Sequence, residues 1–300
     1  MRVMISKELS VVVRRILLVG FVVIVFAAAV AWYVGGALSA PVPRVIGPPP
    51  AVLVADTVTF TSQSGSIIHG WFSRGSTGQG AVLLLHGVRG DRRDMLSRAE
   101  FLHGRGFTVL LIDFQAHGES PGKRITFGDL ESRDVVAALQ FLRRSAPGER
   151  VGVIGVSLGA AAFVLAEGRP PVDAVVLESM YPTLEQAVAD RLQIYLGRWG
   201  SALSPVLLMQ VRVRLGIDAD RLRPIDRIGD IHAPLLLVHG TLDQHTPIAE
   251  AQAVYAAASE PKEWWAIEGA GHVSLYRFAS VGYERRVGEF LMKYLRLPPR

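Results

Sequence analysis

The stretch Val151–Ala160, which reads VGVIGVSLGA, decides the fold of this chain. An apolar run of strand length, Val151–Ile154, enters the pentapeptide Gly-Val-Ser-Leu-Gly, and a helix-like run leaves it. In so tight a turn, side chains two residues before and after the serine would collide with the backbone, and glycine at both positions removes the collision. The turn exposes the hydroxyl of Ser157 above a helix N-terminus, which predicts a nucleophile.

On both sides of this turn, short apolar runs alternate with helix-like segments. The apolar runs lie at Ala81–Leu85, Thr108–Ile112, Val151–Ile154, Ala174–Leu177 and Leu235–Val238. Apolar residues recur at helical spacing in Asp129–Arg144, Ile248–Ala258 and Arg285–Leu295. Continuous apolar runs of this length are typical of strands buried on both faces of a parallel sheet. The sequence therefore predicts an α/β fold with a doubly wound, mostly parallel sheet.

Two further segments complete the predicted architecture. Residues 57–61 and 67–72 alternate in polarity like an antiparallel hairpin at one edge of the sheet. Residues 182–230 separate two core strands, contain no clear strand and are rich in apolar and arginine residues. An insertion of this length in a compact domain is usually functional, and we expect it to form a helical cap.

A nucleophilic serine needs a base and an acid, which in this strand order should follow it with the acid first. Asp243 lies on the loop after the strand Leu235–Val238, at the edge of the sheet where ligand sites form. His272 lies on a glycine-rich loop after the strand-like run Glu263–Ile267. We expect His272 to accept the proton of Ser157 while Asp243 orients the imidazole ring.

Other residues compete for these roles. His245, two residues after Asp243, is an alternative base, and Glu178, after the strand Ala174–Leu177, is an alternative acid. Asp113 also ends a strand but precedes the serine, which breaks the expected order. Three histidines precede a glycine at a strand end or loop, and we expect them to be structural: His86, His117 and His239.

The oxyanion of a tetrahedral intermediate needs hydrogen-bond donors. One expected donor is the backbone N–H of Leu158, the residue after the nucleophile. The second should come from the loop His86–Gly90, with the N–H of Val88 as the candidate. Arg89 in that loop is either a ligand for an acidic substrate group or a solvated loop arginine.

The N-terminal segment is of a different kind. Residues 16–34 hold nineteen uncharged residues, preceded by Arg14 and Arg15 and ending near Trp32 and Tyr33. This pattern predicts a single membrane-spanning helix in residues 1–36, with the N-terminus in the cytoplasm and the catalytic domain outside. The alternative is a signal peptide cleaved near residues 37–40, which would leave an exported soluble protein. Residues 37–50 are proline-rich and predict a semi-rigid spacer before a domain of residues 51–300.

Charge and composition exclude other classes. Of the net charge of +5, three charges lie in the first 40 residues, which leaves +2 for the folded part and no run of basic residues there. We therefore do not expect binding to nucleic acid. There is no cysteine, which excludes disulfides, thiolate metal sites and a cysteine nucleophile. No spacing of residues implies a metal or an organic cofactor, and we expect neither.

Five motifs occur in the order found in one known superfamily: LLLHGVRGD (83–91), LIDFQAHGES (111–120), GVSLGA (155–160), LLLVHGTLDQHTP (235–247) and GAGH (269–272). Over residues 55–296 the chain thus resembles the α/β-hydrolase superfamily. The stretches D-x-x-x-H-G-x-S and H-G-x-x-D resemble its bacterial serine aminopeptidase-like or acylaminoacyl-peptidase-like branch. One departure is the pair His245-Thr246, where relatives often have apolar residues.

The resemblance implies esterase, lipase, thioesterase or peptidase chemistry through an acyl-enzyme. Because the fold alone does not fix the substrate, three functions remain open. The leading hypothesis is hydrolysis of an ester or related acyl bond of a small molecule or lipid through Ser157. The alternatives are a peptidase for short or acylated peptides and a non-catalytic binding module. The oligomeric state is not indicated by the sequence.

Overall fold

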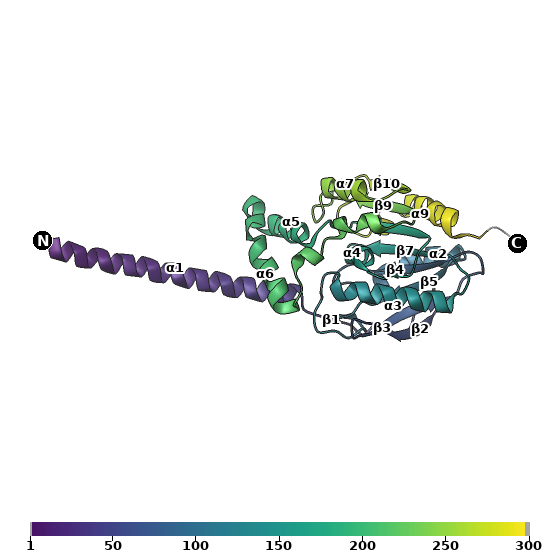
Figure 1. Ribbon diagram of the computed structural model, residues 1–300, viewed down its shortest axis with the longest axis horizontal. Coiled ribbons are helices and arrows are strands. Elements are labelled where there is room, and N and C mark those ends of the chain that lie inside the picture. Colours follow the sequence, from purple (N-terminus) through teal and green to yellow (C-terminus); the bar gives the residue numbers. More distant parts are fainter. Residues whose placement is uncertain (1, 298–300) are drawn as a thin grey trace.

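The structure, a computed structural model, describes residues 2–297, which form an eight-stranded sheet covered by helices (Figure 1). The order of the strands in the sheet is β10-β9-β8-β7-β4-β5-β3-β2. Their bounds are β2 Asp56–Thr61, β3 Ile67–Ser73, β4 Ala81–Leu85, β5 Thr108–Ile112, β7 Val151–Val156, β8 Ala174–Glu178, β9 Leu235–Gly240 and β10 Lys262–Ile267. All neighbours from β5 to β10 pair in parallel, while β3 pairs antiparallel with β5 and with β2. The predicted fold class and the edge hairpin are confirmed.

Helices cover both faces of this sheet because the central strands are apolar on both faces. In β4, Leu83 and Leu85 point into the core beneath α3, α4 and α7, whereas Val82 and Leu84 point into the core beneath α2 and α9. The bounds of the helices are α2 Leu96–Gly104, α3 Asp129–Ser145, α4 Leu158–Leu165, α7 Ile248–Ala257, α8 Leu275–Phe278 and α9 Ser280–Leu295. Each strand of this kind is buried on both faces, so its sequence shows no alternation.

The insertion forms a helical cap. Helix α5 (Leu184–Leu196), the 3₁₀ helix η2 (Gly197–Leu203) and helix α6 (Ser204–Leu215) follow β8, and the 3₁₀ turns η3 (Ala219–Arg221), η4 (Pro224–Asp226) and η5 (Ile228–Asp230) lead back to β9. A small apolar cluster that includes Leu184, Val211 and Leu222 joins the cap to the domain. The cap therefore lies beside the carboxyl ends of the strands, where a ligand site is expected.

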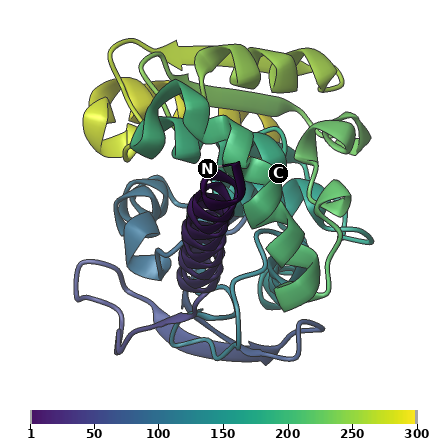
Figure 2. The same cartoon turned by 90° about the vertical axis from the view of Figure 1, so that its left-hand side faces the viewer.

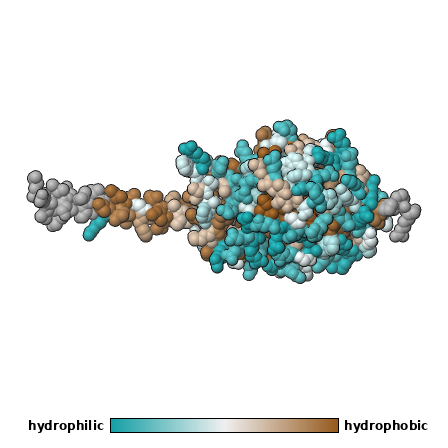
Figure 3. All heavy atoms as spheres, turned by 45° about the horizontal axis from the view of Figure 1, so that its top comes forward, coloured by the Kyte–Doolittle hydropathy of each residue, from teal (hydrophilic) through white to brown (hydrophobic). Residues whose placement is uncertain are grey.

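Helix α1 (Arg2–Leu38) extends away from the domain, as Figure 1 shows. Its part Val13–Leu38 is long and apolar enough to cross a membrane, and none of that stretch is buried inside the structure. Figure 3 shows the hydrophobic surface of this helix running up to the domain. A signal sequence near the N-terminus can meet the same criteria of length and composition, so the helix by itself does not distinguish an anchor from a signal.

The proline-rich segment differs from the expected spacer. Residues 39–47, here called the strap, are hydrogen-bonded along the domain: Val42–Pro43 forms strand β1, paired with β6 (His117–Gly118). The amides of Ile46 and Gly47 donate to Glu119 at 3.0 and 2.9 Å. Proline favours extended backbone, and here the extended backbone finds hydrogen-bond partners on the domain instead of remaining solvated. The folded unit therefore begins before residue 51.

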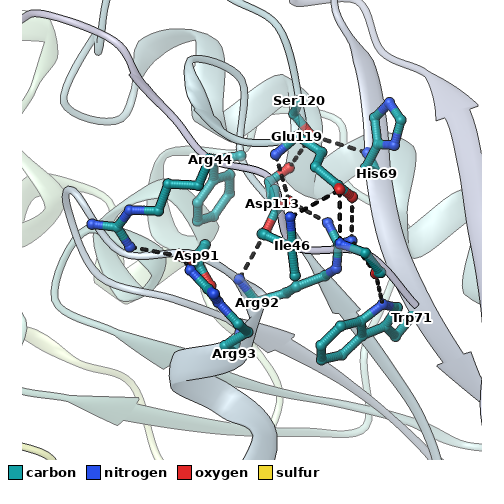
Figure 4. Close-up of polar contacts among 12 residues, drawn as sticks. Arg44, Ile46, His69, Trp71, Asp91, Arg92, Arg93, Asp113, Glu119 and Ser120 are labelled. Carbon is teal, nitrogen blue, oxygen red and sulfur yellow. Dashed lines mark hydrogen bonds and ion pairs between the residues drawn. The ribbon is translucent and has the colours of Figure 1, made fainter. Parts of the chain in front are cut away.

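A buried arginine joins the strap to the sheet, as Figure 4 shows. Arg92, at the start of the 3₁₀ helix η1 (Arg92–Met95), forms ion pairs with Asp113 and Glu119. Its guanidinium lies 4.8 Å from the ring of Trp71. A buried charge is costly unless it is paired. The carboxylate of Asp113, the rival acid, is therefore committed to its ion pair with Arg92.

Candidate active site

Ser157 lies at the sharp turn between β7 and α4, with φ of 49°. A Cβ atom on Gly155 would lie 2.7 Å from the amide nitrogen of Ala160, and one on Gly159 would lie 2.5 Å from the carbonyl oxygen of Leu85. Both distances are impossible for real side chains, so the two glycines allow the strained turn. The predicted geometry around the serine is therefore present.

His272 and Asp243 are brought together from two different loops. The Nδ1 atom of His272 lies 2.8 Å from Oδ2 of Asp243, which is buried, while His272 is partly exposed. The amides of His245 and Thr246 donate to the other carboxylate oxygen of Asp243 at 2.9 and 3.0 Å. Burial raises the pKa of Asp243, but the hydrogen bonds and charges around it outweigh burial and hold that pKa below its usual value. An ionised Asp243 can thus fix the ring orientation and tautomer of His272.

Ser157 and His272 line one cavity of about 520 Å³. Gly87 and Val88 from the loop after β4 and Arg191 from the cap also line it. Among the hydrogen bonds found in residues 2–297, none joins the hydroxyl of Ser157 to His272. Such bonds are often long in the absence of substrate and tighten when it binds.

The loop after β4 passes close to the nucleophile. A Cβ atom on Gly87, the residue before Val88, would lie 3.7 Å from Cβ of Ser157. The amide of Arg89, whose φ is 60°, donates to Nε2 of His117 at 3.1 Å. Leu158 is the first residue of α4, and amides in the first turn have no partner within the helix. Of the two expected oxyanion donors, Leu158 directly follows Ser157 and Val88 lines the same cavity as Ser157.

The three histidines expected to be structural all bond to the backbone. Burial lowers the pKa of His86 to about 4, and its ring lies between the carbonyl of Gly87, 2.7 Å from Nδ1, and the amide of Phe114, which donates to Nε2. Burial likewise lowers the pKa of His117 to about 4, so that Nε2 can accept from Arg89. The Nε2 atom of His239 lies 2.8 Å from the carbonyl of Thr246 and supports the loop of Asp243. These rings stay neutral near pH 7 and shape the loops around the site.

The rival acid Glu178 is committed elsewhere. Its carboxylate accepts hydrogen bonds from Arg98 at 2.9 and 2.5 Å and one from the hydroxyl of Tyr283. All three side chains are buried between β8, α2 and α9. The structure therefore brings Asp243 to His272 and leaves Glu178 in a structural ion pair.

The rival base His245 is close to the site. Its ring centroid lies 5.0 Å from that of His272, and it lines the same cavity. The carboxylate of Asp243 accepts a hydrogen bond from the backbone amide of His245 and not from its imidazole ring. Of these two histidines, His272 is the one whose ring is hydrogen-bonded to the carboxylate of Asp243.

Ser179 and Arg191 are among the cavity residues that sequence reasoning missed. Ser179 follows β8 with φ of 47°, is buried, and its hydroxyl has no hydrogen-bond partner within the part of the chain that the structure describes. Its position at a strand end on the catalytic edge is a signal that could have identified it. Arg191 comes from α5 of the cap, and only the tertiary structure places it at the cavity. Over residues 2–297, no cluster of three or more histidine or acidic side chains is arranged to hold a metal ion.

Comparisons with known proteins place the chain among hydrolases of this fold. The family model described as "Alpha/beta hydrolase family" matches residues 82–281. Rv2307c of Mycobacterium tuberculosis is 34% identical over 220 residues, which cover 72% of this chain and 71% of the relative. YfhR of Escherichia coli is 25% identical over 274 residues, which cover 84% of this chain and 85% of the relative. The solved structure of the Pyrococcus furiosus esterase Pf2001 superposes with a TM-score of 0.69 at 26% identity, covering 86% of this chain and 98% of the esterase.

Proposed function

Since this chain belongs to the alpha/beta hydrolase family, we propose that it is a serine hydrolase that cleaves carboxylic esters through an acyl-enzyme on Ser157. The observation that carries the proposal is the 2.8 Å contact between His272 and Asp243 at the cavity that Ser157 also lines. The likeness to an esterase of known structure favours an ester as the substrate. The narrower aminopeptidase-like branch stays a prediction.

The reaction proceeds in two halves. His272 takes the proton of the Ser157 hydroxyl through Nε2 while Oγ attacks the carbonyl carbon of the ester. The N–H groups of Leu158 and Val88 bind the oxyanion that forms. His272 then gives its proton to the leaving alcohol, and the acyl group stays on Ser157.

Deacylation repeats these steps with water. His272 removes a proton from water, the hydroxide attacks the acyl carbon, and the returned proton restores Ser157 and releases the acid. Asp243 remains ionised throughout, because its hydrogen bonds favour the carboxylate. It stabilises the imidazolium form of His272 in both halves.

We further propose that α1 anchors the enzyme in a membrane, with its N-terminus in the cytoplasm. Arg14 and Arg15 flank the apolar stretch at its start, and Trp32 and Tyr33 lie near its end. The helix is exposed along its apolar part, as expected for a segment whose partner is lipid.

Labelling with a fluorophosphonate probe tests the catalytic proposal. We expect labelling of the wild type and none of Ser157→Ala, whose melting temperature should be close to that of the wild type. A folded wild type that is not labelled would overturn the proposal. A panel of p-nitrophenyl esters and aminoacyl-anilides distinguishes the substrates: faster turnover of the anilides would identify a peptidase instead.

A further inference from the structure

We propose that the cap contacts the same membrane that α1 enters, with the apolar side chains of α5, η2 and α6 in contact with lipid. This inference rests on the membrane anchor proposed above. It adds a second lipid-binding surface, which belongs to the catalytic domain itself.

The cap exposes a set of large apolar side chains. Trp199 is 72% exposed, Tyr195 is 76% exposed and Met209 is 65% exposed. They belong to one stretch of the cap whose exposed apolar members are Ile194, Tyr195, Leu196, Trp199, Leu203, Val206, Met209 and Val213. Large apolar side chains exposed in such number on one part of a domain usually mark a binding surface.

The position of this surface follows from contacts between the cap and α1. Gln210 of α6 donates to the carbonyl of Ala31 at 2.9 Å. The guanidinium of Arg214 lies 3.6 Å from the ring centroid of Trp32 and donates to the carbonyl of the same residue. Figure 2, which looks along α1, shows the cap helices beside its end. Helix α6 thus meets α1 at the aromatic end of its apolar stretch, the level at which tryptophan marks a membrane interface.

The end of α1 is also fixed to the domain. Arg124 donates to the carbonyl of Gly36 and Arg89 donates to that of Ala37, each at 3.2 Å. The amide of Ile125 donates to the carbonyl of Ser39 at 2.9 Å. Carbonyls at a helix C-terminus lack partners within the helix and carry partial negative charge, so the arginines stabilise this end. A membrane-spanning α1 would therefore set the orientation of the domain as well as its location.

Lipid suits the exposed surface better than a second protein chain does. The surface is joined to a helix that is exposed and uncharged over residues 16–30, so both would meet one apolar phase. Arg198 lies 4.8 Å from the ring of Trp199, which pairs a cation with an interfacial aromatic residue. The side chains of arginine and tryptophan each have an apolar body and a polar end, and both therefore favour the boundary between lipid and water.

The same helix connects this surface to the candidate active site. Arg191 of α5 lines the catalytic cavity, and Ile194, three residues later, belongs to the exposed apolar surface. Residues three apart on a helix are neighbours. One wall of the cavity is therefore formed by an element that touches lipid, and we infer that the substrates include esters dissolved in the membrane.

Site-specific labelling tests the contact directly, because the natural chain contains no cysteine. Single variants Trp199→Cys and Met209→Cys of the full chain are labelled with an environment-sensitive fluorophore and placed in phosphatidylcholine–phosphatidylglycerol vesicles. The control is Lys293→Cys, an exposed position near the end of α9 (Ser280–Leu295), far from α1 in Figure 1. We expect a blue-shifted emission and quenching by lipid-borne nitroxides at positions 199 and 209, and neither at position 293.

Equal, weak quenching at all three positions would overturn the inference. Energy transfer between labels at position 199 without lipid quenching would also overturn it and would identify a second copy as the partner. Neither readout needs turnover, so failure of the proposed esterase activity is recorded separately by the fluorophosphonate probe. Release of the chain from vesicles at alkaline pH would show that the anchor had failed.

A kinetic variant tests the consequence for substrates. Trp199→Ser combined with Met209→Ser should raise the KM for a long-chain ester in vesicles about tenfold, which corresponds to about 1.4 kcal/mol of lost binding. The kcat and KM for a short, water-soluble ester should stay unchanged. An equal loss with both esters would show a structural defect in the cap and would contradict the inferred role in reaching membrane-dissolved substrates.

Discussion

The guanidinium of Arg44 lies 2.7 Å from the carboxylate of Asp91 and so joins the strap to the loop beside the nucleophile (Figure 4). A second nitrogen of Arg44 donates to the carbonyl of Arg89 at 2.9 Å. Arg93 binds the same carboxylate of Asp91, but within residues 2–297 it has no hydrogen bond to the carbonyl of Arg89. Arg44 therefore fixes the peptide between Arg89 and Gly90, two peptide units after the N–H of Val88, the candidate oxyanion donor.

Replacing Arg44 by alanine should lower kcat, because the loop that carries Val88 loses the hydrogen bond that fixes the carbonyl of Arg89, two peptide units after the N–H of Val88. A misplacement of about 1 Å near reacting atoms can cost about 100-fold, so we expect a loss of about 10- to 100-fold in kcat with little change in KM. The measurement is steady-state hydrolysis of a p-nitrophenyl ester. Arg93→Ala is the matched control, and an equal loss in both variants would show that only the ion pair with Asp91 matters.

The assignment of the acid and the base gives a second prediction. Asp243→Asn should lower kcat by about 10⁴-fold, because an amide in place of the carboxylate favours the wrong tautomer of His272. His272→Gln should lower kcat by at least as much, whereas His245→Gln should have an effect under tenfold. Single-turnover kinetics with an activated ester measures all three, and a larger loss in His245→Gln than in His272→Gln would exchange their roles.

The ion pair of Glu178 and Arg98 gives a prediction on stability. Glu178→Gln leaves the buried guanidinium of Arg98 without a counter-charge, which should lower the free energy of unfolding by about 3–5 kcal/mol. The double variant Glu178→Leu with Arg98→Met should recover most of this loss, because it removes both charges. Urea unfolding checks both values. A stable Glu178→Gln variant that has lost activity would instead support Glu178 as the catalytic acid.

The carboxyl groups of Asp190 in the cap and Glu250 in α7 predict a dependence of stability on pH. Burial and the charge of Asp190 raise the pKa of Glu250 to about 7, and burial raises the pKa of Asp190 to about 6. Both values exceed those of the unfolded chain, so the folded chain binds more protons between about pH 4 and pH 7. The free energy of unfolding should therefore decrease as the pH rises through this window.

Glu250→Gln removes the contribution of Glu250 to this titration. We expect its melting temperature to fall less than that of the wild type between pH 5 and pH 8, as measured by differential scanning calorimetry. The control is Glu289→Gln, an exposed residue of α9, which should follow the wild type. Identical pH profiles for Glu250→Gln and the wild type would exclude Glu250 as a source of the dependence.

Much of the fold could be predicted because its strongest patterns are local. The strands Ala81–Leu85 and Thr108–Ile112 have the predicted bounds, since a buried strand needs apolar residues along its whole length. Helix α2 (Leu96–Gly104) was not predicted. It contains buried Arg98 beside Ala99 and Leu102, so its core-facing side is not uniformly apolar and periodicity gives a weak signal.

The strap shows where local patterns are insufficient. The proline content of residues 37–50 indicates extended backbone, and the backbone of Val42–Pro43 is indeed extended. Whether extended backbone is a spacer or a paired strand depends on its partners. These partners, Glu119 and the strand His117–Gly118, lie more than seventy residues away in the sequence and reach the strap only through the fold.

The sequence by itself determined the fold class, the strained turn at Ser157 and the pair of loops that carry Asp243 and His272. These features depend on residue type at fixed spacing, because a tight turn demands glycine and a buried strand demands apolar side chains. The tertiary structure decided which carboxylate meets His272, committed Glu178 to Arg98, and placed α6 against the end of α1. Such relationships join distant segments, and only packing sets the distances on which their chemistry depends.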